Sequence, residues 1–163
     1  MKPVTYFQYY IDLNGSENPL TEMQSNLVET LDLLADIPES KAHYAYEKGK
    51  WTVNQLVQHL IDTERIFQYR ALTFAREKNA VVTGYDHDVY ANSAPAAHVT
   101  LEQLVKHFGV LRASSIAMFD LFDESELHSI GTANKIEMTV QQIGLIIPGH
   151  VRHHIGVLEE RYL

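Results

Sequence analysis

Two counts define the chemistry open to this chain of 163 residues, which contains nine histidines and no cysteine. Without cysteine there is no disulfide, no thiol nucleophile and no thiolate ligand in the chain. A transition metal would therefore have to be held by imidazole and carboxylate groups. The histidines are the first residues in which to look for a site.

The strongest candidates are His150 and His154, which stand four residues apart near the end of the chain. On a helix their Cβ atoms would lie about 5–6 Å apart on one face, which suits two imidazoles that bind one metal ion. Both fall within or beside an apolar stripe formed by Ile143, Ile147, Val151 and Ile155. Buried imidazoles need partners. The alternative to a metal site is a helix end where His150 or His154 forms hydrogen bonds in the core and His153 is solvated.

A third metal ligand is predicted at His59, which lies beside the apolar line of another segment, Leu56, Leu60 and Phe67. Facing helices of a bundle bring side chains together that are distant in sequence. Three neutral imidazoles leave coordination positions for water or substrate, which is typical of a catalytic site rather than a closed structural one.

A general base is harder to identify. The segment reads H-V-R-H-H and lacks the glutamate of H-E-x-x-H metalloproteases, so peptidase chemistry is not expected. Glu64 has an alternative structural role as the partner of an arginine such as Arg70, and Asp62 is either a carboxylate behind His59 or a solvated residue. The candidates for the base are Asp86, His87, Asp88 and Glu64.

Three segments that would position these residues share a helix start signal, Thr followed three residues later by Gln. In this capping box the two side chains bond reciprocally to the backbone of the first turn, and a flanking apolar pair often accompanies it. The pairs are Thr52 with Gln55, Thr100 with Gln103, and Thr139 with Gln142. A fourth helix is predicted over residues 18–35, with Asn18 as the cap and Pro19 at the first helical position.

Apolar residues follow these starts at spacings of three, four and seven, the pattern of amphipathic helices. Four such helices bury their stripes against one another, which predicts an all-α four-helix bundle and a single domain over residues 1–163. The longest link, residues 78–99, separates the second and third helices and is expected to serve function. Pro148 predicts a kink in the last helix; the alternative is a break, with the helix starting at Gly149.

The charge balance excludes some partners. The chain has 13 basic and 21 acidic residues and a formal net charge of −8, with no basic run. Nucleic acids and anionic membranes are therefore not expected partners. No apolar stretch approaches the roughly 20 residues of a membrane span, and the start of the chain does not resemble a signal peptide. A soluble, cytoplasmic protein is expected.

Several motifs, taken in order, resemble the DinB-like (DinB/YfiT) metal-binding superfamily over nearly the whole chain. Those of the second helix are Gly49-Lys50-Trp51-Thr52, His59-Leu60-Ile61-Asp62-Thr63-Glu64-Arg65, Tyr69-Arg70-Ala71-Leu72 and Ala75-Arg76. Those that follow are Gly84-Tyr85-Asp86, Gly131-Thr132-Ala133-Asn134, Pro148-Gly149-His150, His153-His154 and Glu159-Glu160-Arg161-Tyr162.

The resemblance implies an up-down-down-up bundle, a homodimer and a three-histidine site for a divalent ion, usually nickel or zinc. Carried over by position, the ligands are His59, His150 and His154. It also implies relatives that act as metal-dependent transferases or isomerases with low-molecular-weight thiols. The hypothesis is therefore a transferase that activates a thiol or water against a small-molecule substrate. The alternatives are a metal-binding or stress-related interaction protein without turnover and a small-molecule hydrolase.

Overall fold

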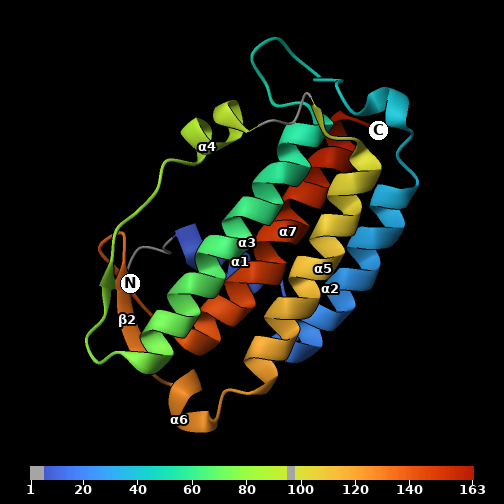
Figure 1. The fold of residues 1–163 in the computed structure, drawn as a ribbon. Coiled ribbons are helices and arrows are strands. Elements are labelled where there is room, and N and C mark those ends of the chain that lie inside the picture. The colour runs from blue at the N-terminus through green and yellow to red at the C-terminus, as the bar shows by residue number, and fades with distance from the viewer. Residues whose placement is uncertain (1–5, 95–97) are drawn as a thin grey trace.

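Four long helices form the body of the molecule in the computed structural model, which describes residues 6–94 and 98–163 (Figure 1). They are α2 (Pro19–Ala35), α3 (Val53–Arg76), α5 (Leu101–Asp120) and α7 (Val140–Arg161). All four predicted caps are confirmed. Asn18 accepts hydrogen bonds from two backbone N–H groups of the first turn of α2, and complete capping boxes open α3, α5 and α7.

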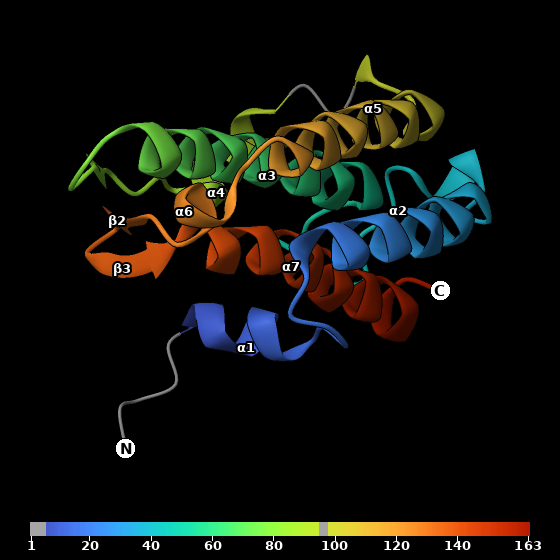
Figure 2. The same ribbon diagram turned by 90° about the horizontal axis from the view of Figure 1, so that it is seen from below.

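The order of the helices is up-down-down-up, as predicted. Among the four long helices, α2 and α3 both contact α5 and α7 (Figure 2). The start of α3 lies beside the start of α5, where the Asn54 side chain donates to the Val99 carbonyl. The end of α7 returns to the start of α3, where the Tyr162 hydroxyl donates to the Trp51 carbonyl. Helices α3 and α5 are therefore parallel, and α3 and α7 are antiparallel.

Shorter elements that the sequence did not predict surround the bundle. Helix α1 (Tyr6–Asp12) packs against α7, α4 (His87–Ser93) packs against α3, and α6 (Glu124–Leu127) follows α5 (Figures 1 and 2). A 3₁₀ turn, η1 (Glu39–Lys41), follows α2. A small sheet contains β1 (Val81–Val82), β2 (Ile130–Ala133) and β3 (Ile136–Thr139). The predicted all-α four-helix bundle is thus confirmed, and a small three-stranded sheet lies beside it.

The sheet joins the two long links of the chain. Strand β1 pairs in parallel with β2, and β2 pairs antiparallel with β3. The hairpin turn is Asn134 and Lys135, both with positive φ, at 50° and 65°, as a two-residue turn of the hairpin type requires. Gly131 lets β2 approach α3, because a Cβ atom there would lie 2.2 Å from the Phe74 ring. The link 78–99 is therefore attached to the bundle at both β1 and α4; its residues 95–97 lie outside the described part.

Helix α7 continues through Pro148 from Val140 to Arg161. The alternative of a helix that starts at Gly149 is therefore wrong. Gly149 has another role, because a Cβ atom there would lie 1.9 Å from the backbone oxygen of Tyr10. The absence of a side chain lets α1 cross α7 directly above the turn that carries His150.

Two apolar clusters fill the interior, one toward each end of the bundle. On each long helix, buried polar residues stand between the residues of the two clusters. They are Asn26 on α2, Thr63 and Glu64 on α3, Arg112 and Ser115 on α5, and His150 on α7. The core is thus divided by a layer of polar side chains, each of which needs a partner.

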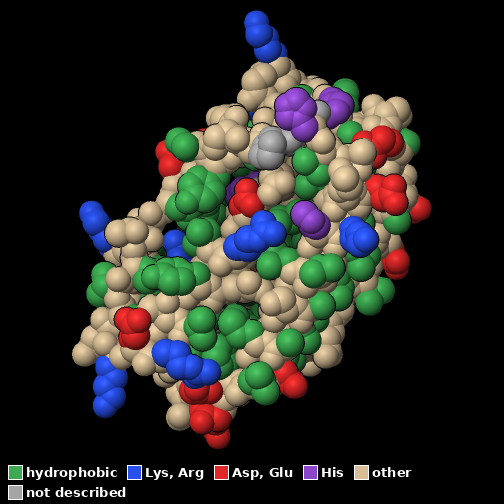
Figure 3. Space-filling view, in the orientation of Figure 1, with side chains coloured by type: hydrophobic (Ala, Val, Ile, Leu, Met, Phe, Trp, Pro, Cys, Tyr) green, Lys and Arg blue, Asp and Glu red, His purple; other side chains and the backbone are tan. Residues whose placement is uncertain are grey.

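Among the described residues, no helix is long and apolar enough to cross a membrane. The face seen in Figure 3 carries Lys, Arg, Asp and Glu side chains among apolar and uncharged ones.

Candidate metal centre

Three histidines from two helices meet inside the bundle. Each offers one ring nitrogen to a group in which all such atoms lie within 4.8 Å of one another. The Nε2 atom of His150 lies 3.1 Å from Nε2 of His59 and 3.1 Å from Nε2 of His154. His59 and His150 are each only 6% exposed, and His154 is half-buried. The structure therefore brings together the same three residues that the sequence selected.

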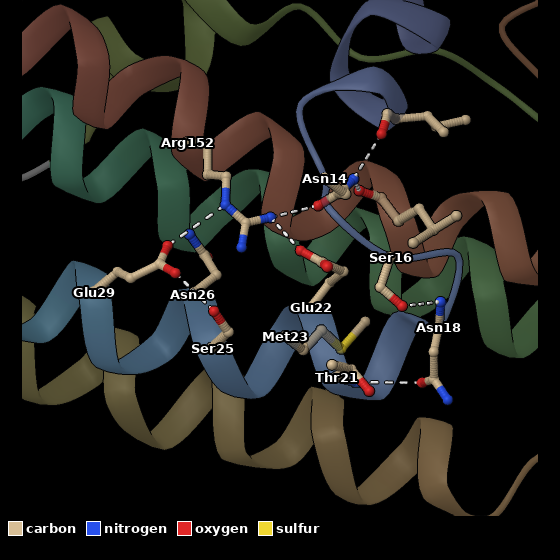
Figure 4. A network of polar contacts seen from close by, with 12 residues as sticks. Asn14, Ser16, Asn18, Thr21, Glu22, Met23, Ser25, Asn26, Glu29 and Arg152 are labelled. Atoms are coloured by element: carbon tan, nitrogen blue, oxygen red, sulfur yellow. Dashed lines mark hydrogen bonds and ion pairs between the residues drawn. The ribbon is translucent and has the colours of Figure 1, made fainter.

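The elements that carry these rings are held in a fixed relation. His150 and His154 lie one turn apart on α7, and His59 lies on the antiparallel helix α3. Arg152 lies between the two α7 histidines in sequence, and its side chain extends toward α2 (Figure 4). It donates to Asn14 and Glu22 at 2.6 Å each, and it pairs with Glu29 at 3.4 Å. These contacts attach the turn of α7 that bears the ligands to α2 and to the segment between α1 and α2.

Burial sets the protonation of the three rings. It lowers the pKa of His59 to about 4 and that of His154 to about 3. The pKa of His150 is lowered well below the usual value, again chiefly by burial and then by the neighbouring His154 and His59. All three imidazoles are therefore neutral at pH 7, and each has one nitrogen with a free lone pair.

The arrangement fits a divalent metal ion. Two nitrogens that each lie about 2.0–2.1 Å from a tetrahedral zinc ion are about 3.3 Å apart, close to the 3.1 Å separations found here. Without an ion, the Nε2 atom of His150 faces two other Nε2 atoms but can donate to only one of them or accept from only one. Three neutral nitrogen donors suit zinc and nickel.

A hydrogen-bonded chain stands behind one ligand. The Thr63 hydroxyl lies 3.4 Å from Nδ1 of His59 and 2.6 Å from the Tyr85 hydroxyl. A partner on the second ring nitrogen orients a metal-ligating histidine and fixes its tautomer. Thr63 is one turn beyond His59 on α3, whereas Tyr85 comes from the link before α4. The link therefore contributes directly to the site.

The three ring nitrogens face a cavity of about 260 Å³. Aromatic rings form much of its wall, and the Tyr10 and Trp51 rings pack against His150 and His59 at centroid distances of 5.3 and 4.7 Å. No Asp or Glu of the described residues lines it. Its lining residues are Tyr6, Phe7, Tyr10, Trp51, His59, Thr63, Phe67, Arg70, Gly84, Tyr85, His87, Asn134, His150 and His154.

The candidates for the general base are scattered. Asp86 is exposed and caps α4, where its carboxylate accepts from the backbone N–H groups of Asp88 and Val89. Asp88 is also exposed. Of the four candidates, only His87 lines the cavity, with its ring centroid 5.9 Å from that of His59.

Glu64 lies on another face of α3, where both carboxylate oxygens accept from Arg112, at 2.8 and 3.0 Å. The predicted structural role of Glu64 as the partner of an arginine is therefore confirmed, although that arginine is Arg112 and not Arg70. Asp62 accepts from Gln58 at 2.9 Å and from Arg65 at 3.4 Å, so it has no contact with His59 of the kind considered. His153 lies 3.3 Å from the Tyr9 hydroxyl, between α7 and α1.

Several residues of the site were not predicted as functional, including Trp51, Tyr10 and Arg70. One signal was present. His59, Thr63, Phe67 and Arg70 follow one another at spacings of four, four and three, which places them along one face of a helix. Tyr10 had no such signal, because its place above His150 depends on the packing of α1 against α7.

Comparison with known proteins agrees with this architecture. The model of the DinB superfamily matches residues 22–158, so the chain belongs to that superfamily. A solved structure of YfiT from Bacillus subtilis covers 98% of this chain and 89% of its own, with a TM-score of 0.72 and 18% sequence identity. That protein is described as "a probable metal-dependent hydrolase with an unusual four-helix bundle topology". No curated protein matches the sequence.

Proposed function

We propose that this protein is an enzyme that uses a divalent metal ion, zinc or nickel, to activate water or a low-molecular-weight thiol against a small organic substrate. One observation carries the proposal: three neutral imidazole nitrogens converge on the wall of a cavity. A purely structural metal site is closed by its protein ligands, whereas this one faces space for a further ligand. The description of YfiT as a metal-dependent hydrolase supports the proposal by likeness of fold.

The chemistry divides between the ion and the chain. His59, His150 and His154 would hold a divalent ion, which would supply a nucleophile at neutral pH by lowering the pKa of water or of a thiol. Thr63 and Tyr85 keep the His59 ring in place. The aromatic wall limits the access of bulk water to the substrate. Since the chain has no cysteine, a thiol would enter as a cosubstrate.

His87 is the group proposed to accept the proton of the nucleophile. It lines the cavity, and its Nε2 atom lies 3.8 Å from a carboxylate oxygen of Asp88. His87→Gln is expected to lower kcat by about 100-fold, the usual contribution of a general base, with the metal content unchanged. A kcat equal to that of the wild type would remove His87 from the mechanism.

The metal site is tested first. Protein purified without an affinity tag and reconstituted with zinc or nickel is expected to hold about one ion per chain by elemental analysis. The double variant His150→Ala/His154→Ala is expected to hold none, because a single imidazole cannot retain the ion. The matched control is His43→Ala/His107→Ala, which removes two exposed histidines. Retention of full metal by the first variant would contradict the site.

Turnover is tested by two assays on metal-loaded and metal-stripped protein. One follows the conjugation of several biological thiols to 1-chloro-2,4-dinitrobenzene, and the other follows the hydrolysis of 4-nitrophenyl acetate. At least one rate is expected to depend on the metal and to vanish in the His150→Ala/His154→Ala variant. Equal rates in both states in both assays would contradict the enzyme and favour a metal-binding protein without turnover.

A further inference from the structure

Arg70 is a buried cation with no ion-pair partner among the residues that the structure describes. Its residue is only 3% exposed, and its Nε atom has no hydrogen-bond partner. No ion pair and no hydrogen bond joins its side chain to any described residue. A buried charge is costly unless it is paired, and arginine cannot escape the cost by losing its proton at neutral pH. The structure thus retains a charge that nothing in the described chain neutralises.

Aromatic rings hold the Arg70 side chain in position. Its guanidinium carbon lies 5.3 Å from the centroid of the Phe67 ring and 5.9 Å from that of Tyr85. Burial lowers the pKa of Arg70, and the neighbouring Tyr85 acts in the opposite direction. Rings that contact a guanidinium attract its charge but leave its N–H groups unused as donors. The donors are therefore available to a ligand.

The cavity places these donors in the same space as the histidines. Arg70 lines the cavity together with His59, His150 and His154. Arg70 is eleven positions after His59 on α3, which is a rotation of about 1,100°, or about 20° from the same face, and a rise of about 16 Å. Thr63 and Phe67 lie between them on that face and also line the cavity. A ligand that reached both ends would lie along α3.

The charge of the cavity determines which ligand fits. No Asp or Glu of the described residues lines it. Arg70 is its one permanently charged group among those residues. An ion on the histidines would add positive charge. A ligand with an anionic group therefore balances the cavity, and a planar guanidinium matches a carboxylate through two parallel hydrogen bonds.

We propose that Arg70 binds the carboxylate of the substrate, so that the substrates are small organic acids whose reactive bond lies several bonds from the carboxylate. This names the substrate class of the proposed function and rests on it for the position of the reactive bond. The carboxylate sits toward the Phe67 and Tyr85 end of the cavity, and the reactive end sits at the three histidines. Arg70 acts as a specificity-determining residue.

The test uses the tryptophan of the chain as its probe. Trp51 is the one tryptophan in the sequence, and it lines the cavity, so its fluorescence reports occupancy. Metal-loaded protein is titrated with 3-phenylpropionate and with the neutral isostere 3-phenylpropanamide. The acid is expected to bind at least about tenfold more tightly, since a charge-assisted bidentate pair forms only with the carboxylate. Equal affinities would overturn the proposal.

Variants assign the preference to Arg70. Arg70→Met is expected to abolish the preference for the acid, whereas Arg65→Gln, which removes an exposed arginine of the same helix, keeps it. An unchanged preference in Arg70→Met would overturn the proposal. If circular dichroism shows that Arg70→Met does not fold, Arg70→Lys replaces it. The lysine is expected to weaken the preference several-fold because it lacks the fork of donors, and full retention would overturn the proposal.

Repeating the fluorescence titration after a chelator has removed the metal separates this inference from the proposed function. The preference for the acid is expected to persist, because it depends on Arg70 and not on the ion; its disappearance would place the carboxylate at the metal and overturn the inference. Metal-independent turnover with an intact preference would contradict the proposed function alone.

Discussion

Arg112 of α5 and Arg70 of α3 are both buried, but one has partners for its charge and the other has none among the described residues. The side chain of Arg112 is fully buried, and it donates to both carboxylate oxygens of Glu64, to Asn26 and to the Met23 carbonyl. Ser115 donates to the same carboxylate at 2.6 Å. Arg70 has none of these partners and faces a cavity.

The difference separates a structural network from a binding site. Around Glu64 the polar groups satisfy one another, so the network is closed and holds α2, α3 and α5 in register. Around the three histidines, donor and acceptor groups are left over and point into space that a ligand can enter. Buried polar groups without internal partners are costly, and their persistence is expected where a metal or substrate completes them.

A substitution in the network around Glu64 is expected to have the largest effect on the free energy of unfolding. Glu64→Ala leaves the Arg112 charge buried without a counterion, which typically costs about 3–5 kcal/mol of the free energy of unfolding. Urea denaturation followed by circular dichroism measures it. Glu29→Ala, which removes an exposed pair with Arg152, is the control and is expected to cost less than about 1 kcal/mol. Equal losses in the two variants would remove the distinction between the regions.

A substitution beside the cavity of the three histidines is expected to have a smaller effect on the free energy of unfolding. Gly149→Ala places a Cβ atom 1.9 Å from the Tyr10 backbone oxygen, so α1 must move away from α7. Overpacking of this kind costs about 1–3 kcal/mol. Because Tyr10 packs on His150, the affinity for zinc is expected to fall as well, which a competition titration with a chromophoric chelator measures. Gly156→Ala is the control, because a Cβ atom there meets nothing within 4 Å.

The smallest effect is expected at the hydrogen-bonded chain behind His59. Thr63→Val removes the hydroxyl that contacts His59 and Tyr85, and loss of such a partner costs about 10–100-fold in metal affinity. The control is Thr73→Val, which removes a hydroxyl of α3 that is bonded to the Tyr69 carbonyl. An unchanged zinc affinity in Thr63→Val would show that packing alone orients the ring.

The helix starts could be predicted because their signals are local. Thr52, Thr100 and Thr139 bond to backbone groups within three residues, so four consecutive residues contain the whole interaction. His150 and His154 could be predicted for a similar reason, because residues four positions apart on one helix share a face. The third, His59, required the assumption that its helix packs against the last one, and the structure confirms that packing.

The short elements were missed because their stability is not local. Helix α4 and strand β1 have seven and two residues, and such segments are not stable without tertiary contacts. The hairpin had a weak signal in Asn134 followed by Lys135, a pair without the usual glycine of such turns. Because these short elements were not predicted, Tyr85 and His87 could not be placed at the cavity that both of them line.

By itself, the sequence determined that four capped amphipathic helices form and that imidazole would be the metal ligand. Only the tertiary structure decided how the faces of α3 are used. Glu64 and Arg70 are six residues apart, a rotation of about 600° that leaves them about 120° apart around the helix. Each charge therefore meets a different neighbour, and Glu64 pairs with Arg112 on α5 while Arg70 faces the cavity. Which side chain is paired depends on what lies across from it, and packing sets that.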